Sequence, residues 1–239
     1  MRNPIIVALD VPSPDTALGL ATRLAPLVGA FKIGTELFTS AGPDIVRRVR
    51  ATGAAVFLDL KFHDIPNTVA KSVEAAAHLD VQMLTVHASG GLAMLQAAEK
   101  AAQHAARALN RPPPVVLAVT VLTSLDTTAL AQIGFAGTIG KQVERLASLA
   151  ASAGLRGLVC SPLEIADLRI LLPAGFQLVT PGIRPADTAM DDQKRTLTPA
   201  EAVAAGATWL VIGRPIYAAK DPAAAAERIL ASLSAAPVR

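Results

Sequence analysis

Short apolar runs alternate along this chain with longer, alanine-rich amphipathic segments, and the alternation occurs eight times. Most of the apolar runs are continuous, which is typical of parallel strands that are buried on both faces. Segments such as "SPDTALGLATRLAPLV" and "SPLEIADLRILL" carry helix start signals between them. The expected strands are residues 5–10, 31–34, 55–60, 83–88, 115–120, 157–160, 177–182 and 209–213.

Eight strands, each followed by helix, in 239 residues predict an α/β fold, a single (β/α)8 TIM barrel. The alternative is an open doubly wound sheet. No G-x-G-x-x-G follows the first strand, and the sequence contains no Walker-type phosphate loop. No interior stretch has the composition of a linker, so we expect residues 1–239 to form one domain.

Composition narrows the class of protein. No apolar run approaches the roughly 18 residues of a membrane span, and the first ten residues lack the pattern of a secretory signal. Cys160 is the one cysteine, which fits a reducing compartment, so a cytoplasmic protein is expected. The net charge is +3, but there is no Lys/Arg run and aromatic residues are 3%. A small phosphorylated ligand therefore fits better than nucleic acid or a membrane.

Charged and polar residues collect where the predicted strands end. In a (β/α)8 barrel this is the end that carries the active site. The residues at these strand ends, or in the loops that follow, are Asp10, Lys32, Asp59, Lys61, Asp64, His87, Thr120, Thr123, Arg184 and Arg214.

Each of these residues also has an ordinary structural interpretation. Asp10 could be a helix N-cap, and Lys32 could be a surface lysine whose stem lies along apolar neighbours. His87 could be a hydrogen-bonded rim histidine, and His63 an exposed loop residue. These interpretations do not explain why so many polar residues lie at the same end of the predicted barrel.

Three other features also have structural interpretations. Cys160 and Trp209 are expected to be core residues. "HDIPNT" is consistent with a helix start that has Pro66 near the first turn and Asn67 or Thr68 as the cap.

Asp59 and Lys61 are two residues apart, so on a regular strand both side chains project to the same side. Lys32 on the neighbouring strand could reach that side too. Opposite unit charges about 4 Å apart attract by about 4 kcal/mol at an effective dielectric near 20. Such a network is a poor general base but a strong fixed field that contains a proton donor.

"TPGIR" and "VIGRP" follow the seventh and eighth strands, where barrels often bind phosphate. Glycine amides can approach phosphate oxygens, and an arginine guanidinium offers two hydrogen bonds. We expect Gly213 and Arg214 to bind phosphate, with Gln193 or Arg184 contributing. Residues 183–197 form a long polar loop of the kind that often acts as a lid.

"LDLKFHDIPNT", with its D-x-K-x-x-D signature, resembles the orotidine 5′-phosphate decarboxylase family. The resemblance spans nearly the whole chain, through "ALD", "FKIG", "TVHASGG", "VTVLTS", "TPGIR" and "VIGRPIY". A wider superfamily of sugar-phosphate decarboxylases and aldolases shares D-x-K-x-x-D. The "IPNT" extension, "VLTS" and a glutamine-containing lid are more specific.

The resemblance implies loss of CO₂ from orotidine 5′-monophosphate to give UMP, the last step of de novo pyrimidine synthesis, without metal or organic cofactor. Lys61 would stabilise the charge that develops at pyrimidine C6 and then protonate that carbon. Asp59 would lie beside the departing carboxylate and hold Lys61. Lys32 would pair with Asp59 and contact the ribose, and Asp10 would bind a ribose hydroxyl.

The resemblance also implies a homodimer with shared active sites and assigns the remaining substrate contacts. Asp64, counted among the catalytic residues, and Thr68 would reach into the neighbouring subunit's site. The other residues that the resemblance places at the substrate are Ile65, Thr123, Ser124 and Pro181, with Arg184, Gln193, Gly213 and Arg214 at the phosphate.

Two other functions remain open from the sequence. A sugar-phosphate lyase of the same superfamily would use the acidic residues to hold Mg²⁺ beside an enediolate. A non-catalytic protein that binds a phosphorylated ligand could also be built on a barrel. An opposed Asp59–Lys61 pair argues against a mere binder, because burying both charges costs desolvation free energy.

Overall fold

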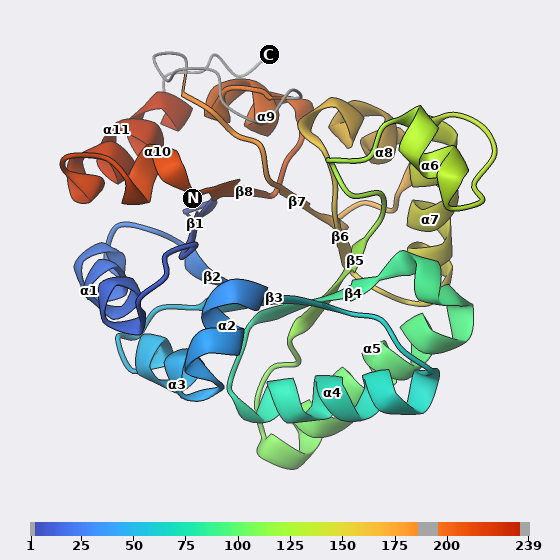
Figure 1. The fold of residues 1–239 in the computed structure, drawn as a ribbon, viewed down its shortest axis with the longest axis horizontal. Helices are drawn as coiled ribbons and strands as arrows, with labels where there is room; N and C mark the ends of the chain where they lie inside the picture. The colour runs from blue at the N-terminus through green and yellow to red at the C-terminus, as the bar shows by residue number, and fades with distance from the viewer. Residues whose placement is uncertain (1–2, 186–195, 235–239) are drawn as a thin grey trace.

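Eight parallel strands form a closed barrel in the computed structural model, which describes residues 3–185 and 196–234. Each strand pairs with its neighbours along the chain, and β1 pairs with β8 through Ile6 and Val211. The ring is seen end-on in Figure 1. The strands are β1 (Ile5–Ala8), β2 (Ala30–Gly34), β3 (Val56–Phe62), β4 (Met83–His87), β5 (Val115–Val119), β6 (Gly157–Val159), β7 (Gln177–Thr180) and β8 (Trp209–Ile212).

The predicted (β/α)8 barrel is therefore confirmed, and the open doubly wound alternative is wrong. Every predicted strand coincides with an observed one, and most boundaries differ by only one or two residues. The difference that matters is at the end of β3, which continues to Phe62 and so includes Lys61. The sequence predicts a strand only to residue 60, and the two further residues belong to an irregular segment at the carboxyl end of the strand.

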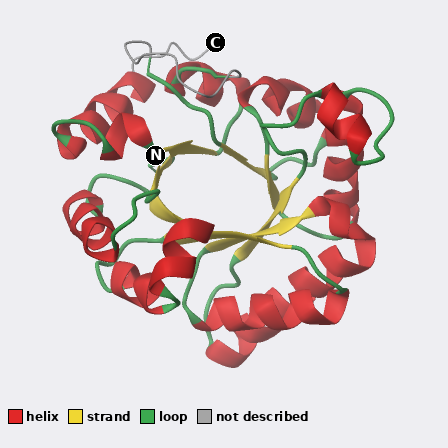
Figure 2. Ribbon diagram, in the orientation of Figure 1, coloured by secondary structure: helices red, strands yellow, loops and turns green. Residues whose placement is uncertain are grey.

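Helices surround the ring of strands on its outside (Figure 2). They cover the outer face of the barrel, as parallel strands that are buried on both sides require. The helices are α1 (Pro14–Leu24), α2 (Thr35–Ala41), α3 (Asp44–Arg50), α4 (Pro66–His78), η1 (Ala88–Gly90), α5 (Gly91–Leu109), α6 (Thr127–Gln132), α7 (Ile139–Ser152), η2 (Pro162–Glu164), α8 (Ile165–Leu171), α9 (Pro199–Ala205), α10 (Arg214–Tyr217) and α11 (Pro222–Ser234).

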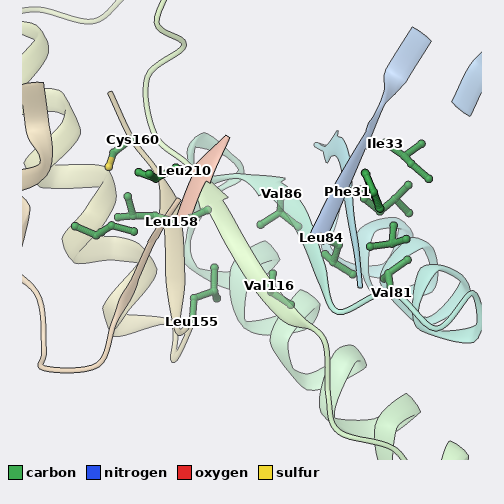
Figure 3. Close-up of a cluster of buried hydrophobic side chains, with 14 of the residues drawn as sticks. Phe31, Ile33, Val81, Leu84, Val86, Val116, Leu155, Leu158, Cys160 and Leu210 are labelled. Atoms are coloured by element: carbon green, nitrogen blue, oxygen red, sulfur yellow. The ribbon is translucent and has the colours of Figure 1, made fainter. Parts of the chain in front are cut away.

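The alternation of side chains along each strand creates two apolar layers. One layer lies between strands and helices and includes Phe31, Leu84 and Leu158 (Figure 3). The other fills the barrel interior and includes Phe57 and Trp209. Both layers are almost completely inaccessible to solvent, so the strands have rigid surroundings on both faces.

Cys160 and Trp209 are each 2% exposed, which confirms both as core residues. The indole Nε1 of Trp209 donates a hydrogen bond to Gln177 Oε1 at 2.9 Å, so the polar atom of this ring is satisfied inside the barrel. His63 is exposed in the loop after β3, as expected.

The start of α4 differs from the sequence interpretation. Its N-cap is Ile65, with φ −58° and ψ 152°, and no side chain caps the first turn. Pro66 occupies the first turn as expected, but Asn67 and Thr68 lie inside the helix and are not its cap. A cap residue must keep non-helical backbone, and the residue that precedes a proline is biased towards such a conformation.

Within the residues that the structure describes, no helix is both long enough and apolar enough to cross a membrane.

Two glycines provide a matched test of this packing. Gly29 precedes β2, and a methyl group there would overlap the Asn3 carbonyl and lie 2.8 Å from Trp209 Cζ3. Gly19 is in α1, and a methyl group there would meet no atom within 4 Å. In urea denaturation, Gly29→Ala should lower the free energy of unfolding by about 1–3 kcal/mol, whereas Gly19→Ala should raise it by about 0.5–1 kcal/mol. Equal effects at both positions would contradict the packing described for Gly29.

Candidate functional site

The inward-facing positions of the strands continue beyond the apolar interior and become charged at the carboxyl end of the barrel. Ala30 and Phe57 belong to the interior cluster, and the next inward positions along these two strands are Lys32 and Asp59. Asp10 follows β1 at the corresponding step after Ala8. The period of the strands therefore brings residues that are distant in sequence to one layer above the core.

These residues are linked to one another by a continuous series of ionic contacts. Lys61 Nζ lies 2.9 Å from Asp59 Oδ2, and Lys32 Nζ lies 3.9 Å from the same oxygen. Lys32 Nζ also donates to Asp10 Oδ1 at 2.8 Å. The pairing of Asp59 with both lysines, predicted from their spacing, is confirmed. The contact with Lys32 also rejects the ordinary interpretation of Asp10, because the N-cap of α1 is Ser13.

The two central side chains of this network are largely buried, which raises the cost of losing any one contact. The Lys32 and Asp59 side chains are 12% and 14% exposed, so Lys32 is not a surface lysine. Lys61 is 34% exposed and Asp10 49%, so accessibility rises towards the mouth of the barrel. Removing one member of a buried pair leaves an uncompensated charge, which is far more costly than losing a pair in water.

The backbone of Lys61 is unusual, with φ at +52°. Few residues other than glycine adopt this left-handed region, and holding one there costs about 1–3 kcal/mol. The pairing of β3 with β4 shifts at the same place, between Leu58↔Leu84 and Phe62↔Val86. Lys61 therefore reaches Asp59 from a distorted strand, and the two-residue alternation that predicted their proximity is not by itself the reason for it.

Thr85 on β4 contacts both members of this pair, and sequence reasoning did not single it out. Its hydroxyl accepts from the Lys61 backbone N–H at 2.9 Å and contacts Asp59 Oδ1 at 3.0 Å. The residue is 0% exposed. A threonine inside an apolar strand run gives a weak sequence signal, and only the partner across the sheet reveals what its hydroxyl does.

Gly34 is a second residue that sequence reasoning did not identify. A methyl group on Gly34 would lie 3.0 Å from Lys32 Nζ and 3.5 Å from Asp10 Oδ1. The absence of a side chain therefore leaves the space in which Lys32 meets Asp10. Gly34 is the β2 partner of Asp59, so it lies directly beside the charged layer.

A cavity of about 200 Å³ opens above the charged residues. Lys32, Asp59 and Lys61 line it together with Thr123 and Pro181, two residues that the family resemblance places at the substrate. Ser124, which the resemblance also places there, lies next to Thr123 in an exposed turn but is not among the lining residues. The remaining lining residues are Phe57, Val119, Val121, Leu122, Val159, Cys160 and Val211.

Asp64, Ile65 and Thr68 lie outside this arrangement. All three are exposed at the start of α4, and Ile65 is 66% exposed. Asp64 Oδ1 accepts from the Ile65 backbone N–H at 2.6 Å. Within the described part of the chain, Asp64 forms no hydrogen bond or ion pair with Asp59 or Lys61, so this chain's own network does not include it.

The residues predicted to bind phosphate lie after β7 and β8. Gly213 is the N-cap of α10, and Arg214 is the exposed first residue of that helix. The Arg184 backbone N–H donates to the Leu197 carbonyl at 3.0 Å, and Ile183 and Leu197 form a bridge. The two ends of the predicted lid, 183–197, are therefore joined. Gln193 lies outside the described residues.

The chain matches the model of the Orotidine 5'-phosphate decarboxylase / HUMPS family over residues 3–229. The chain belongs to this family. The match includes all eight strands and every candidate site residue named above.

Several relatives carry the name orotidine 5'-phosphate decarboxylase. The protein from Moorella thermoacetica is 54% identical over 233 residues, covering 97% of this chain and 92% of the relative. The protein from Opitutus terrae is also 54% identical over 233 residues, covering 98% and 99%. Among solved structures, orotidine 5'-phosphate decarboxylase from Lactobacillus acidophilus superposes with a TM-score of 0.87 at 38% identity, covering 98% of this chain and 100% of that one.

Tyr217 is the last residue of α10, the short helix that follows β8. A methyl group on Gly213 would lie 3.4 Å from Tyr217 Cε1. Burial raises the pKa of the Tyr217 hydroxyl, and the negative charge of Asp10 raises it further, whereas Arg214 and Arg184 lower it. The Tyr217 hydroxyl therefore stays neutral near pH 7. It lies close enough to interact electrostatically with Asp10, Arg184 and Arg214, which are predicted to bind the ribose and the phosphate.

His87 ends β4 and packs against His63, with ring centroids 5.3 Å apart. His87 lies at the rim of the barrel, as expected. Among the described residues, however, its side chain makes this ring contact and no hydrogen bond. Burial lowers the pKa of the His87 imidazole, and electrostatic interactions with His63 and Lys61 lower it further. His87 is therefore neutral near pH 7.

Among the residues that the structure describes, no group of three or more His, Cys, Asp or Glu side chains is arranged to hold a metal ion. Both oxygens of Asp59 already have partners, Thr85 on one and Lys61 on the other.

Cys160 lines the cavity, and its reactivity tests how well the interior is closed. Burial raises the pKa of the thiol to about 12, from an ordinary value of 9.0. The thiol should therefore resist iodoacetamide at pH 8 in the folded protein and react readily in 6 M urea, because the thiolate is the nucleophile. Rapid labelling of the folded protein would contradict this burial.

The same pKa shift makes stability depend on pH. The unfolded chain loses the thiol proton above pH 9, whereas the folded chain keeps it until about pH 12. The contribution of Cys160 is thus fully present below pH 9 and is lost as the pH rises through that window. Cys160→Ala should show a smaller fall in the free energy of unfolding between pH 9 and 11 than the parent.

Proposed function

We propose that this chain catalyses the decarboxylation of orotidine 5′-monophosphate to UMP and CO₂, the last step of de novo pyrimidine synthesis. The observation that carries the proposal is the Lys61–Asp59 contact of 2.9 Å, with Lys32 beside it, at the wall of a cavity. Membership of the family and relatives named orotidine 5'-phosphate decarboxylase at 54% identity support the substrate and the reaction.

The chemistry requires a strong local field. When the C6–carboxylate bond breaks, the electron pair stays on C6 in the plane of the ring, where it cannot delocalise into the π system. Each tenfold gain in rate requires about 1.4 kcal/mol of transition-state stabilisation. A preorganised ammonium group at C6 supplies this electrostatically and needs no reorganisation at the moment of reaction.

Lys61 and Asp59 have separate roles in this proposal. CO₂ departs, the Lys61 ammonium stabilises the pair left on C6, and Nζ then donates its proton to that carbon to give UMP. Solvent restores the proton to Lys61. Asp59 lies beside the departing carboxylate and holds Lys61, consistent with the 2.9 Å contact. The residues of the chain carry each step, and we propose no metal or organic cofactor.

The ribose and base would be held by residues around the same cavity. Lys32 and Asp10, which contact each other at 2.8 Å, would bind ribose hydroxyls. Thr123 and Pro181 line the cavity and would contact the pyrimidine. Ser124 and Ile65 would join them.

Arg184, Gln193, Gly213 and Arg214 would hold the phosphate, with residues 183–197 closing over it. The bridge between Ile183 and Leu197 supports this, because it joins the two ends of the loop. Binding energy from this remote group can be used to close the loop and orient the reacting one.

A homodimer would complete the site, with Asp64 and Thr68 reaching the partner's cavity. Both are exposed beside the charged network but take no part in it within one chain. Exposed apolar side chains on the same side support an interface there. Leu122 and Ile133 are 38% and 60% exposed and line a pocket with His63, the neighbour of Asp64. We also propose that residues 1–239 act as one domain and work in the cytoplasm.

The test is ultraviolet absorbance of the purified protein mixed with orotidine 5′-monophosphate, with and without EDTA. Conversion to UMP at the same rate in both samples is expected, because Lys61 and Asp59 supply the charge. Conversion that is lost with EDTA and restored by Mg²⁺ would contradict the proposal that no metal takes part. Absence of conversion would reject the proposed reaction and favour a Mg²⁺-dependent sugar-phosphate lyase.

Two lysine variants sharpen this assay. Lys61→Ala should reduce turnover by at least about 10³-fold, since it removes both the stabilising charge and the proton donor. Lys100→Ala changes an exposed lysine of α5 in the same way and should leave the rate unchanged. Circular dichroism should be the same for all three proteins, and near-normal turnover in Lys61→Ala would overturn the mechanism.

Arg214 provides a separate test of the phosphate site. Arg214→Ala should weaken inhibition by UMP about 10–100-fold, as expected for loss of a charge-assisted hydrogen bond. Inhibition by uridine, which lacks the phosphate, should change by less than about threefold. Arg228→Ala, an exposed arginine of α11, serves as the control. Equal losses for UMP and uridine would place the phosphate elsewhere.

A further inference from the structure

We infer that Thr85 is a positioning residue that fixes Lys61 and Asp59 relative to one another through a single hydroxyl group. The inference rests on the proposed function for its kinetic consequences, but its structural content does not depend on the substrate. Thr85 lies on β4, the strand next to the one that carries both charged residues.

The first observation is the irregular pairing of β3 with β4. Leu58 pairs with Leu84 and Phe62 with Val86, so three residues of β3 lie opposite Thr85 alone. A regular ladder would offer each backbone N–H a carbonyl of the neighbouring strand. Here the Lys61 N–H instead donates to the Thr85 hydroxyl at 2.9 Å. The side chain thus replaces the ladder bond that the irregularity removes.

The second observation is the direction of the hydrogen bonds. A threonine hydroxyl has one proton to donate. Because Oγ1 accepts from the Lys61 N–H, its proton is available for Asp59 Oδ1 at 3.0 Å. The other carboxylate oxygen, Oδ2, is then left to accept from Lys61 Nζ at 2.9 Å. Thr85 thereby fixes the plane of the carboxylate as well as its position.

These contacts close a ring. Starting from the Lys61 backbone, it runs through the Thr85 hydroxyl to Asp59 and returns through the carboxylate to the Lys61 ammonium. The ring holds Lys61 at both ends, backbone and side chain. It also explains how a lysine remains at φ +52°, a conformation that needs support from its surroundings.

Burial makes the hydroxyl hard to replace. Thr85 is 0% exposed, so water cannot take over its hydrogen bonds when the hydroxyl is removed. The Lys61 N–H and Asp59 Oδ1 would both lose a partner and would move to recover one. A displacement of about 1 Å at reacting groups can cost about 100-fold in rate.

Two pairs of variants isolate the hydroxyl. Thr85→Val keeps the shape of the side chain and removes the hydroxyl, and Thr85→Ser keeps the hydroxyl and removes the methyl group. We expect kcat for orotidine 5′-monophosphate to fall about 10–100-fold in Thr85→Val, with KM changed by less than about threefold. Thr85→Ser should stay within about fivefold of the parent. Thr85→Ala against Thr85→Ser repeats the comparison if the valine variant does not fold.

Thr180→Val is the matched control. Thr180 is also 0% exposed on a barrel strand, but among the described residues its hydroxyl contacts only the Cys160 sulfur, at 3.8 Å. It should retain kcat within about twofold. Parent-like kcat in Thr85→Val, or a serine variant as impaired as the variants without a hydroxyl, would overturn the inference.

Crystal structures of the ligand-free variants give a readout that does not depend on activity. In Thr85→Val the contact between Lys61 Nζ and Asp59 Oδ2, now 2.9 Å, should lengthen beyond 4 Å, or φ of Lys61 should leave +52°. Thr85→Ser should preserve both. Unchanged geometry in Thr85→Val would reject the positioning role. Altered geometry together with a parent protein that does not convert orotidine 5′-monophosphate would retain that role and reject the proposed reaction.

Discussion

The contact between Lys61 Nζ and Asp59 Oδ2 is the interaction on which the rest of the site depends. The Asp59 side chain is 14% exposed, so its charge requires close partners. Thr85 and Lys61 each hold one oxygen of the carboxylate, and Lys32 lies 3.9 Å from the oxygen that accepts from Lys61. Chemistry that needs a fixed field at one atom is suited to such an arrangement, because the charges are already in place before a ligand arrives.

The barrel makes this arrangement possible. Residues deeper along the strands fill the interior with apolar side chains, and Phe57 lies directly below the level of Asp59 on β3. A rigid apolar layer beneath the charges limits their movement and keeps the dielectric low on one side, which strengthens the field above it. Asp10 and Lys61, which are more exposed, lie towards the opening where a ligand would enter.

The residues proposed to bind phosphate lie after β7 and β8, whereas Asp59 and Lys61 belong to β3. In the proposed reaction, this separation would let one part of the nucleotide be bound while another part reacts. The start of α4 shows the complementary feature. Asp64 and Thr68 are exposed there, and in the proposed homodimer they would contact a second copy of the chain.

The sequence by itself determined the fold and the meeting of three charged residues at one end of it. Eight apolar runs separated by helical segments can bury both faces of their strands in a closed barrel, and strand ends then bring Asp10, Lys32 and Asp59 together. These features depend on the spacing of apolar residues and on the order of strands and helices along the chain, and both can be read from a sequence.

The tertiary structure alone decided how Lys61 is held. The shifted pairing of β3 and β4, the positive φ of Lys61 and the role of Thr85 all depend on which residues face each other across two strands. The same is true of Gly34, whose missing side chain matters because Lys32 occupies the space beside it. Contacts between strands are set by register, and register is a property of the folded sheet that no single strand encodes.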